Sequence, residues 1–327
     1  MNPQKSDPTP QQKTALAEIL PHIADSATPL SNAKISELSD LTAGELKQFE
    51  AVWSGMDTER KQQLLSRLSE LSDDNVELNF DRIYRNAIYD IDDTVRKEAI
   101  EGLWESSDTS LIRPLLRLAQ DDPATDVRAA ATAALGRFSL LAEHHKISAE
   151  NRTRISEVLL AVIQKREESL EVRRRALEAV SPISLPDVTR AIWEAYRHEE
   201  PEIKISAVYA MGRNCDLLWM PTVLKEMDSD DQEMRYEAAT AAGELGEAEA
   251  IPQLVELTRD TDTEVKMAAI LALGKIGGQE ARQRLRVLLS SKSRAVREAA
   301  GQAMAELESG EVPLNPHEAG VDEQDTD

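Results

Sequence analysis

One short pattern recurs seven times along this 327-residue chain and constrains its fold more than any other feature. Each copy has an apolar residue followed at once by arginine or lysine, and alanine stands four positions after the apolar residue. We call the apolar residue the anchor of its copy; the anchors are Val95, Val127, Val172, Ile203, Met234, Val265 and Val296. Successive anchors are 32, 45, 31, 31, 31 and 31 residues apart. A period near 31 residues predicts a stacked array of small units rather than one globular core.

The residue seven positions after each anchor is also small, being glycine in the first copy and alanine in the other six. Positions 0, 4 and 7 lie on one face of an α-helix. A face with one larger apolar residue and two small ones lets two helix axes come close together. We therefore expect the alanines to form the contacts between the helices of successive units.

The basic residue after each anchor falls in the first turn of the expected helix, where the helix dipole disfavours positive charge. A nearby acid is needed to tolerate it in every copy, so we expect a ladder of ion pairs between these residues and acids in the turns. Five copies also carry a side chain that can cap the helix three residues before the anchor; these residues are Asp92, Ser169, Asp231, Asp262 and Ser293.

A second helix is expected in each unit about 12 residues before the next anchor, where apolar clusters occur and prolines stand near the start. The resulting pattern, D-x-x-x-V-R-x-x-A-x-x-A-L-G, resembles the HEAT-like repeat of phycobilisome lyases. The copies that run from Asp262 to Gly274 and from Asp126 to Gly136 are nearest to it, whereas the copy at Val172 lacks the final glycine. The resemblance implies an all-α fold, a right-handed α-solenoid of about seven HEAT-like helix-turn-helix repeats.

The repeats also suggest how the chain is divided. We assign residues 81–307 to the array and residues 13–80, which hold amphipathic segments, to a helical N-terminal cap over its exposed end. The polar segment 1–12 and the acidic segment 308–327, which has no basic residue, are expected to be disordered. The 45-residue separation exceeds the period by 14 residues around 138–151, and we expect these to lengthen a turn, either as a partner contact or as a loop without a task.

Composition excludes several classes of function. The chain has 38 basic and 60 acidic residues, a net charge of -22, which argues against nucleic-acid and membrane-surface partners. No apolar run reaches the length of roughly 18 residues that a membrane span needs. The N-terminal segment lacks the apolar core of a secretory signal, so a cytoplasmic location is expected. One cysteine, Cys215, rules out an internal disulfide.

The sequence offers little for catalysis or metal binding. The neighbours His144 and His145 would point about 100° apart on a helix, and no third ligand is near in the sequence. Deoxyhypusine hydroxylase, a metal enzyme of similar repeats, uses several His-Glu dyads. This chain has only His198-Glu199 and His317-Glu318, the second in the acidic tail. We therefore expect no enzyme activity, cofactor or metal, with a metal-dependent oxygenase as an alternative that bound iron would reveal.

The expected function is that of a non-enzymatic scaffold or adaptor, which binds a partner protein or peptide on the concave face. The alternative that the resemblance implies is a bilin lyase-like or chaperone-like subunit acting on phycobiliproteins. The resemblance also implies that the second helix of each unit lines the concave side. The candidate contact residues are then Trp193, Tyr196, Arg197, Trp219, Arg113, Arg117, Lys225 and Arg259.

Aromatic residues with arginines nearby are frequent anchors of protein interfaces. The alternative for Trp193, Tyr196 and Trp219 is that they fill gaps that the small alanines leave between helices. Trp104 takes the place of the glycine that follows four of the other anchors by nine residues, and we expect it to be buried against the N-terminal cap.

Overall fold

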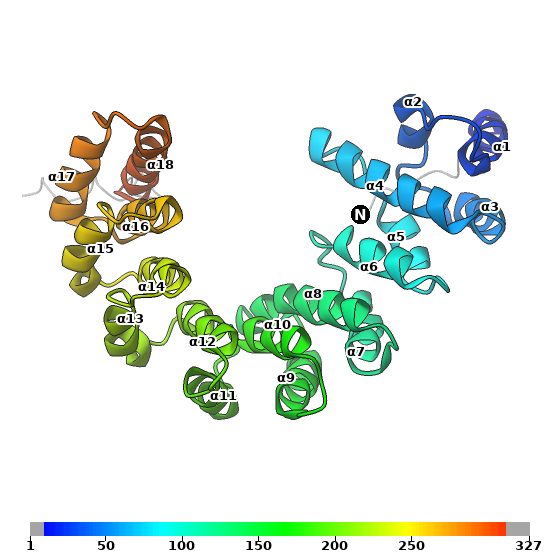
Figure 1. Cartoon of the computed structure of the whole chain (residues 1–327). Coiled ribbons are helices and arrows are strands. Elements are labelled where there is room, and N and C mark those ends of the chain that lie inside the picture. Colours follow the sequence, from blue (N-terminus) through cyan, green and yellow to red (C-terminus); the bar gives the residue numbers. More distant parts are fainter. Residues whose placement is uncertain (1–9, 312–327) are drawn as a thin grey trace, which may run out of the picture. The chain divides into compact units, whose positions relative to one another are not determined.

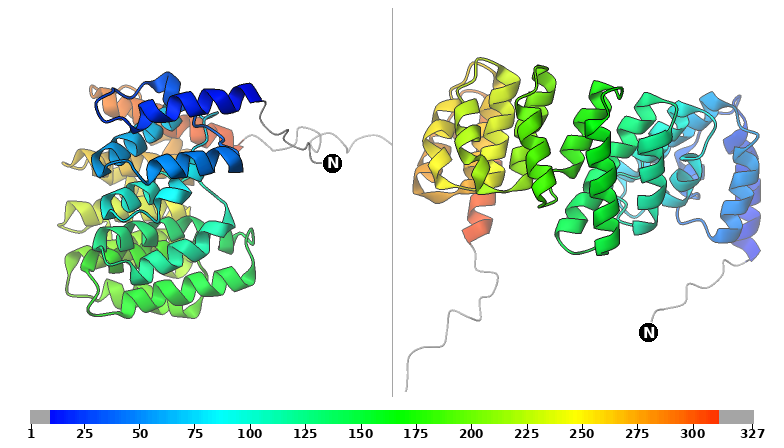
Figure 2. Two further views of the ribbon diagram at one scale, coloured as in Figure 1. Left: turned by 90° about the vertical axis from the view of Figure 1, so that its right-hand side faces the viewer. Right: turned by 90° about the horizontal axis from the view of Figure 1, so that it is seen from below.

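The computed structural model describes residues 10–311, and every regular element in that range is a helix. The chain is therefore an all-α repeat protein, as the sequence predicts (Figures 1 and 2). Its contacts divide it into two compact units. The N-terminal unit is Met1–Val180 and the C-terminal unit is Ser181–Asp327. The anchors at Val95, Val127 and Val172 belong to the first unit, and the remaining four belong to the second.

The N-terminal unit begins with four helices that lack the repeat pattern. They are α1 (Pro10–Ala24), α2 (Asn32–Ser36), α3 (Ala43–Trp53) and α4 (Thr58–Asp74). The predicted cap region, residues 13–80, is thus helical. Residues 1–9 of the segment predicted to be disordered lie outside the described residues, and α1 already begins at Pro10.

Two kinds of helix follow. The anchor helices carry the repeat pattern; they are α6 (Asp93–Glu101), α8 (Thr125–Glu143), α10 (Leu170–Val180), α12 (Pro201–Asn214), α14 (Gln232–Leu245), α16 (Thr263–Ile276) and α18 (Arg294–Glu311). A leading helix precedes each of them; these are α5 (Asp81–Ala87), α7 (Ile112–Asp121), α9 (Ala149–Gln164), α11 (Pro186–Tyr196), α13 (Met220–Glu226), α15 (Ile251–Leu257) and α17 (Gly278–Leu288). Short 3-10 turns at Thr109–Leu111, Leu217–Trp219 and Ala248–Ala250 introduce α7, α13 and α15.

The anchor helices pack closely on one another through small residues. All seven anchors and all seven alanines four residues later are buried. Gly243 of α14 lies against Ala272 of α16, so close that a Cβ on Gly243 would be 2.9 Å from the Ala272 Cα. Gly212 faces Ala241 and Gly274 faces Ala303 in the same way. The predicted alanine contacts between the anchor helices of successive repeats are therefore confirmed. In these three contacts, glycine is the residue that faces the alanine.

This packing decides which helices lie inside the curve of each unit. Neighbouring anchor helices make extensive contacts, whereas neighbouring leading helices make few. In Figure 1 the anchor helices α12, α14, α16 and α18 lie on the inside of the C-terminal unit and the leading helices on its outside; α8 and α10 lie inside α7 and α9. The prediction that the leading helix lines the concave side is wrong, because the small residues shorten the spacing of the anchor layer.

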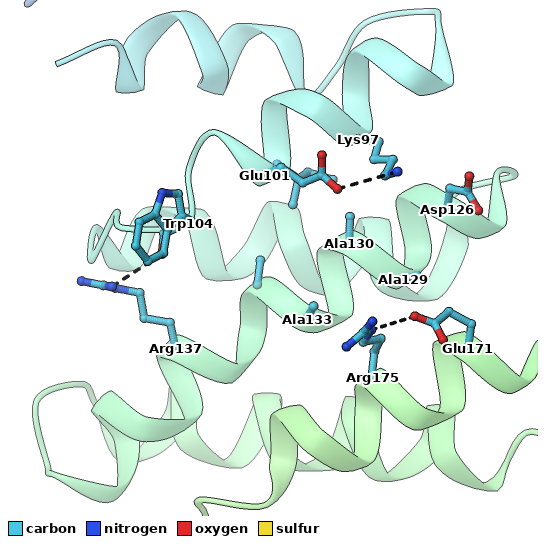
Figure 3. Close-up of a pocket in the computed structure, with 12 residues that line it drawn as sticks. Lys97, Glu101, Trp104, Asp126, Ala129, Ala130, Ala133, Arg137, Glu171 and Arg175 are labelled. Carbon is cyan, nitrogen blue, oxygen red and sulfur yellow. Dashed lines mark hydrogen bonds and ion pairs between the residues drawn. The ribbon is translucent and has the colours of Figure 1, made fainter. Parts of the chain in front are cut away.

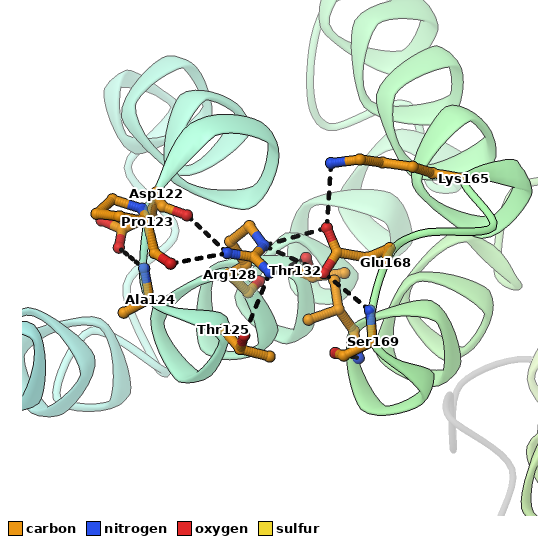
Figure 4. A network of polar contacts seen from close by, with 10 residues as sticks. Asp122, Pro123, Ala124, Thr125, Arg128, Thr132, Lys165, Glu168 and Ser169 are labelled. Carbon is orange, nitrogen blue, oxygen red and sulfur yellow. Dashed lines mark hydrogen bonds and ion pairs between the residues drawn. The ribbon is translucent and has the colours of Figure 1, made fainter.

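The basic residue after each anchor forms the expected ladder in three copies. Arg96 contacts Asp122 through two hydrogen bonds of 2.9 and 2.8 Å, and Arg235 contacts Asp260 at 2.8 and 3.1 Å. The third pair is Arg128 with Glu168 (Figure 4). Each arginine also donates to a carbonyl of the turn that precedes its own helix, at 2.9, 2.8 and 2.8 Å. The arginine thus joins its own turn to the turn of the next copy.

Helix α4, which precedes the first repeat, extends this ladder by a different side chain. Lys61 of α4 contacts Asp90 at 2.8 Å, and the Trp53 indole N–H donates to the same carboxylate at 2.7 Å. Asp90 lies five residues before its anchor, as Asp122 and Asp260 do. Helix α4 therefore supplies a cation to the acid of the first repeat.

The repeat pattern changes where the two units divide. Ser181 stands nine residues after the anchor Val172, where Gly136, Gly212 and Gly243 stand in other copies. His198 takes the acidic position five residues before Ile203. The glycine position and the acidic position are therefore both altered here. Arg173, the basic residue after the anchor Val172, donates to the Ile163 carbonyl of its own unit at 3.0 Å.

Two segments differ from what the sequence predicts. The extra residues 138–151 do not form a long loop, because α8 continues to Glu143 and α9 already starts at Ala149. They mainly lengthen two helices, and only residues 144–148 connect them. At the other end, α18 runs to Glu311, four residues into the predicted acidic tail, and residues 312–327 lie outside the described residues.

Candidate functional site

A groove lies on the inner layer of the N-terminal unit, across α6, α8 and α10 (Figure 3). Its volume is about 550 Å³. The floor is made of alanines of α8 that no other helix covers completely, and charged side chains of all three helices surround it. We call it the inner groove; the residues used below are Trp104, Ala129, Ala130, Ala133, Arg137 and Arg175.

The alanine floor follows from the helix period. Ala131 faces the core and is fully buried, whereas Ala130 and Ala133 lie on the opposite side of α8. Ala133 is exposed and Ala130 is half-buried. An alanine side chain is short, so this stretch of α8 is a shallow apolar surface that another chain could approach closely.

Trp104 stands at one end of the inner groove, and 64% of it is exposed. The expectation that Trp104 is buried against the N-terminal cap is therefore wrong. The Arg137 guanidinium lies beside it, donating to the Trp104 carbonyl at 3.5 Å and to the Ser107 hydroxyl at 2.9 Å. Trp104 is thus a large apolar side chain held at the surface next to a cation.

The rim of the inner groove is balanced in charge. Lys97 pairs with Glu101 of the same helix at 3.8 Å, and Arg175 donates to Glu171 at 2.8 Å (Figure 3). Arg175 also donates to Glu178 at 3.0 Å. Burial disfavours the charged form of Arg175, but the two carboxylates outweigh it and raise its pKa. The rim therefore offers polar contacts of both signs around an apolar floor.

The predicted aromatic candidates form a cluster in the C-terminal unit, but one of them is core. The rings of Trp193 and Trp219 are 5.0 Å apart, and those of Trp193 and Tyr196 are 6.0 Å apart. Trp219 is completely buried, and its indole N–H donates to Asn214 Oδ1 at 2.9 Å. Trp219 cannot contact a partner in this structure, so its assignment as a contact residue is wrong and the gap-filling alternative holds for it.

The other two aromatic residues are half-buried. The Arg197 guanidinium lies 5.4 Å from the centre of the Trp193 ring, a cation–π contact on the outer layer. Lys204 and Lys225 lie 5.1 and 5.6 Å from the Tyr196 ring. Trp193, Tyr196, Arg197 and Lys225 therefore share one area of the C-terminal unit, on the leading helices.

Tyr196 is part of a charged network around a buried carboxylate. Its hydroxyl donates to Glu226, which also accepts from Lys225 at 2.9 Å and lies 3.7 Å from Lys204. Burial opposes ionisation of Glu226, but the Lys225 and Tyr196 hydrogen bonds outweigh it and lower the pKa of the carboxyl. The same burial and the Glu226 charge raise the pKa of Tyr196. All three contacts are made by one carboxylate oxygen, Glu226 Oε1, and they hold it among its neighbours, which favours a structural role.

The three remaining candidates are dispersed. Arg113 and Arg117 are exposed on α7, one helical turn apart, in the N-terminal unit. Arg259 follows α15 in the C-terminal unit and pairs with Glu256 at 2.7 Å, both side chains being mostly exposed. The structure thus does not gather the eight candidates into one site. Sequence reasoning missed Ala133 and Arg137, although the run of alanines in α8 was visible.

Within residues 10–311, no three histidine, cysteine or acidic side chains come together in an arrangement that could hold a metal ion. His198 accepts a hydrogen bond from the Glu200 amide at 3.1 Å through Nδ1. The second predicted dyad, His317-Glu318, is outside the described residues. Over that same range, no helix combines the length and the apolar character needed to cross a bilayer.

Comparison with protein families finds HEAT repeats at residues 85–145 and 220–305. The chain therefore carries HEAT-like repeats. The two matched stretches of the HEAT-like array contain five of the seven anchors, all but Val172 and Ile203. The match is to HEAT repeats in general, so the phycobilisome-lyase type of repeat is not confirmed. No curated protein matches the chain.

Solved structures similar to the HEAT-like array include the Escherichia coli protein YibA, with 16% identity over 73% of this chain and 96% of that one, at a TM-score of 0.43. Human deoxyhypusine hydroxylase in complex with glycerol has 18% identity over 91% and 98% of the two chains, at a TM-score of 0.36. A designed armadillo repeat protein has 18% identity over 60% and 99%, at 0.37. Likenesses this weak do not bear on activity.

Proposed function

We propose that this protein is a non-catalytic scaffold that holds a segment of a partner protein in the inner groove of its N-terminal unit. The observation that carries the proposal is the exposure of Trp104 at the end of an uncovered alanine floor. Tryptophan and arginine are the side chains that most often dominate binding energy at protein interfaces, and Trp104 and Arg137 stand together here.

The inner groove suits a peptide or a helix better than a small substrate. Its floor is flat and apolar because Ala129, Ala130 and Ala133 have short side chains, so a partner backbone can come near. Its rim carries Lys97 and Arg175 beside carboxylates, which can exchange their present ion pairs for pairs with a partner. An apolar centre with a polar rim is the usual composition of a protein interface.

Site-specific crosslinking in extracts of the native cells tests this proposal. A photoreactive phenylalanine analogue replaces Ala133 in the inner groove, and, as a control, Ala161, an exposed alanine on α9. We expect the Ala133 position to crosslink a defined partner that the Ala161 position does not. Trp104→Ala in the same chain should remove that product. The same products from both positions, or a product that survives Trp104→Ala, would contradict the proposal.

A further inference from the structure

A second groove of the N-terminal unit differs from the inner groove in charge and lies on the leading helices. It runs between α7 and α9, which contact each other, and its volume is about 850 Å³. Three arginines line it, Arg113 and Arg117 from α7 and Arg154 from α9, together with the ring of Tyr89. We call it the arginine groove.

One wall of the arginine groove depends on the extra residues 138–151 between the anchors Val127 and Val172. They lengthen α9 at its N-terminal end, so that α9 has 16 residues where α7 has 10. Asn151, at that end, lines the arginine groove, and Arg154 follows one turn later. The lengthened helix therefore forms one wall of the groove.

The charge of the arginine groove contrasts with that of the whole chain. Its lining has three arginines against one carboxylate, Asp121, in a chain of net charge -22. Arg154 pairs with Glu150 of its own helix, but 55% of the Arg154 side chain and 70% of the Glu150 side chain are exposed. Such a pair contributes little and opens easily to an incoming anion.

Arg113 and Arg117 are the less usual feature. Most arginines of this chain contact a carboxylate, as in the ladder. Among the described residues, no carboxylate forms an ion pair with either Arg113 or Arg117, and Arg117 instead lies 5.6 Å from the centre of the Tyr89 ring. Like charges four residues apart on a helix repel each other. An anion between them would relieve that repulsion.

We propose that the arginine groove binds an acidic peptide of a partner protein. The planar guanidinium groups of Arg113 and Arg117 each present two parallel donors, which match a carboxylate side chain. The amides of Asn151 and Gln120 can hydrogen-bond the peptide backbone, and the exposed Tyr89 ring offers an apolar contact. The net charge of -22 disfavours a long polyanion such as nucleic acid, whereas a short acidic segment meets only the local arginines.

This site is separate from the inner groove, so the scaffold could hold two different partner segments. Its test uses the full chain and a fluorescein-labelled hexaglutamate peptide, with binding followed by fluorescence anisotropy at low salt. The test variant is Arg113→Glu with Arg117→Glu. The control variant is Arg166→Glu with Arg286→Glu, two exposed arginines outside the arginine groove, because it changes the net charge by the same amount.

We expect the test variant to bind the peptide at least about tenfold more weakly than the parent chain, and the control variant to bind within about twofold of it. Circular dichroism checks that both variants fold. Equal losses in the two variants would show that only net charge matters and would overturn the proposal, as would an absence of binding by the parent chain.

Two further measurements test which peptide binds the arginine groove and whether the two grooves act separately. A peptide of residues 312–327, which is also acidic, serves as a competitor; if it binds this groove more tightly than hexaglutamate does, the occupant is the chain's own tail and the partner assignment is overturned. Trp104→Ala should leave hexaglutamate binding unchanged. This arm separates failure of the arginine groove from failure of the inner groove.

Discussion

The Arg128 guanidinium of one repeat binds the Glu168 carboxylate of the next, with Nη2 and Oε1 2.7 Å apart. Only 2% of the Glu168 side chain is exposed, and it also accepts from the Ser169 amide at 3.0 Å (Figure 4). The pair holds α8 and α10 in register at a point where 14 additional residues separate the anchors. A buried pair of this kind matters mostly when one member is removed, because the other is left without a partner.

Glu168→Ala should therefore destabilise the protein by about 3 kcal/mol, since it leaves the Arg128 charge largely buried and unpaired. The neighbouring Glu167 is exposed, so Glu167→Ala should change stability by less than about 0.5 kcal/mol. Urea unfolding of the two variants measures the difference. Similar losses in both would mean that the ladder does not stabilise the array.

The same pair makes a prediction about pH. Burial opposes ionisation of Glu168, but Arg128 outweighs it and holds the pKa of the carboxyl below its ordinary 4.5. Because the folded-state pKa is the lower one, the stabilisation is complete above pH 4.5 and is lost as pH falls through the folded-state value. Glu168→Gln should be less stable than the parent chain at pH 7, and the gap should narrow below pH 4.5. A gap that stays constant down to pH 3 would contradict this assignment.

The glycines of the anchor helices allow a test in which two like substitutions have opposite effects. A Cβ on Gly274 would lie 2.7 Å from both the Cα and the carbonyl oxygen of Ala303, so α16 and α18 would have to separate. Gly301, inside α18, has no such neighbour within 4 Å. Gly274→Ala should destabilise by about 1–3 kcal/mol, whereas Gly301→Ala should stabilise by up to about 1 kcal/mol through its higher helix propensity. Thermal unfolding gives both signs, and a stabilising Gly274→Ala would refute close packing at this contact.

The repeat pattern predicts most of the fold because each part of it is local. Val265, Ala269 and Ala272 share a helix face whatever surrounds them, and the Asp262 side chain caps its helix by accepting from the Val265 amide at 3.1 Å. The inside of the curve could not be predicted in this way. It depends on the spacing of whole helix layers within a unit. In the C-terminal unit, glycine contacts such as that of Gly243 with Ala272 set this spacing.

The candidate site shows the same limit. Trp193 and Trp219 are alike in the sequence, yet Trp219 enters the core from the 3-10 turn before α13 while Trp193 stays half-buried over it. Trp104 occupies a glycine position, which suggested burial, but 64% of it is exposed. Exposure of a single large side chain depends on what its neighbours leave uncovered, and no local pattern contains that information.

Trp219 is fully buried and Trp104 is largely exposed, and this difference gives a further prediction. Trp219→Ala should lower stability by about 3–5 kcal/mol, because it leaves a cavity and removes the partner of Asn214. Trp104→Ala should change stability by less than about 1 kcal/mol, because the side chain is largely solvated already. Differential scanning calorimetry compares the two, and a large loss with Trp104→Ala would remove the reason to assign this residue to a binding surface.

Cys215 ends α12 at a position where the next two copies have glycine. Its backbone is left-handed, with φ of 54°, and Gly246, 31 residues later, ends α14 in the same conformation with φ of 74°. A side chain in this conformation costs about 1–2 kcal/mol relative to glycine, part of which the greater freedom of glycine in the unfolded chain offsets. The Cys215 thiol makes only weak hydrogen-bond contacts, to the Gly212 carbonyl at 3.3 Å and to the Arg213 carbonyl at 3.8 Å. Cys215→Gly should therefore stabilise the protein by about 1 kcal/mol, while Cys215→Val should destabilise it, because a β-branched residue tolerates positive φ least. Urea unfolding distinguishes these signs; destabilisation by Cys215→Gly would show that the thiol contributes more than the backbone strain that it imposes.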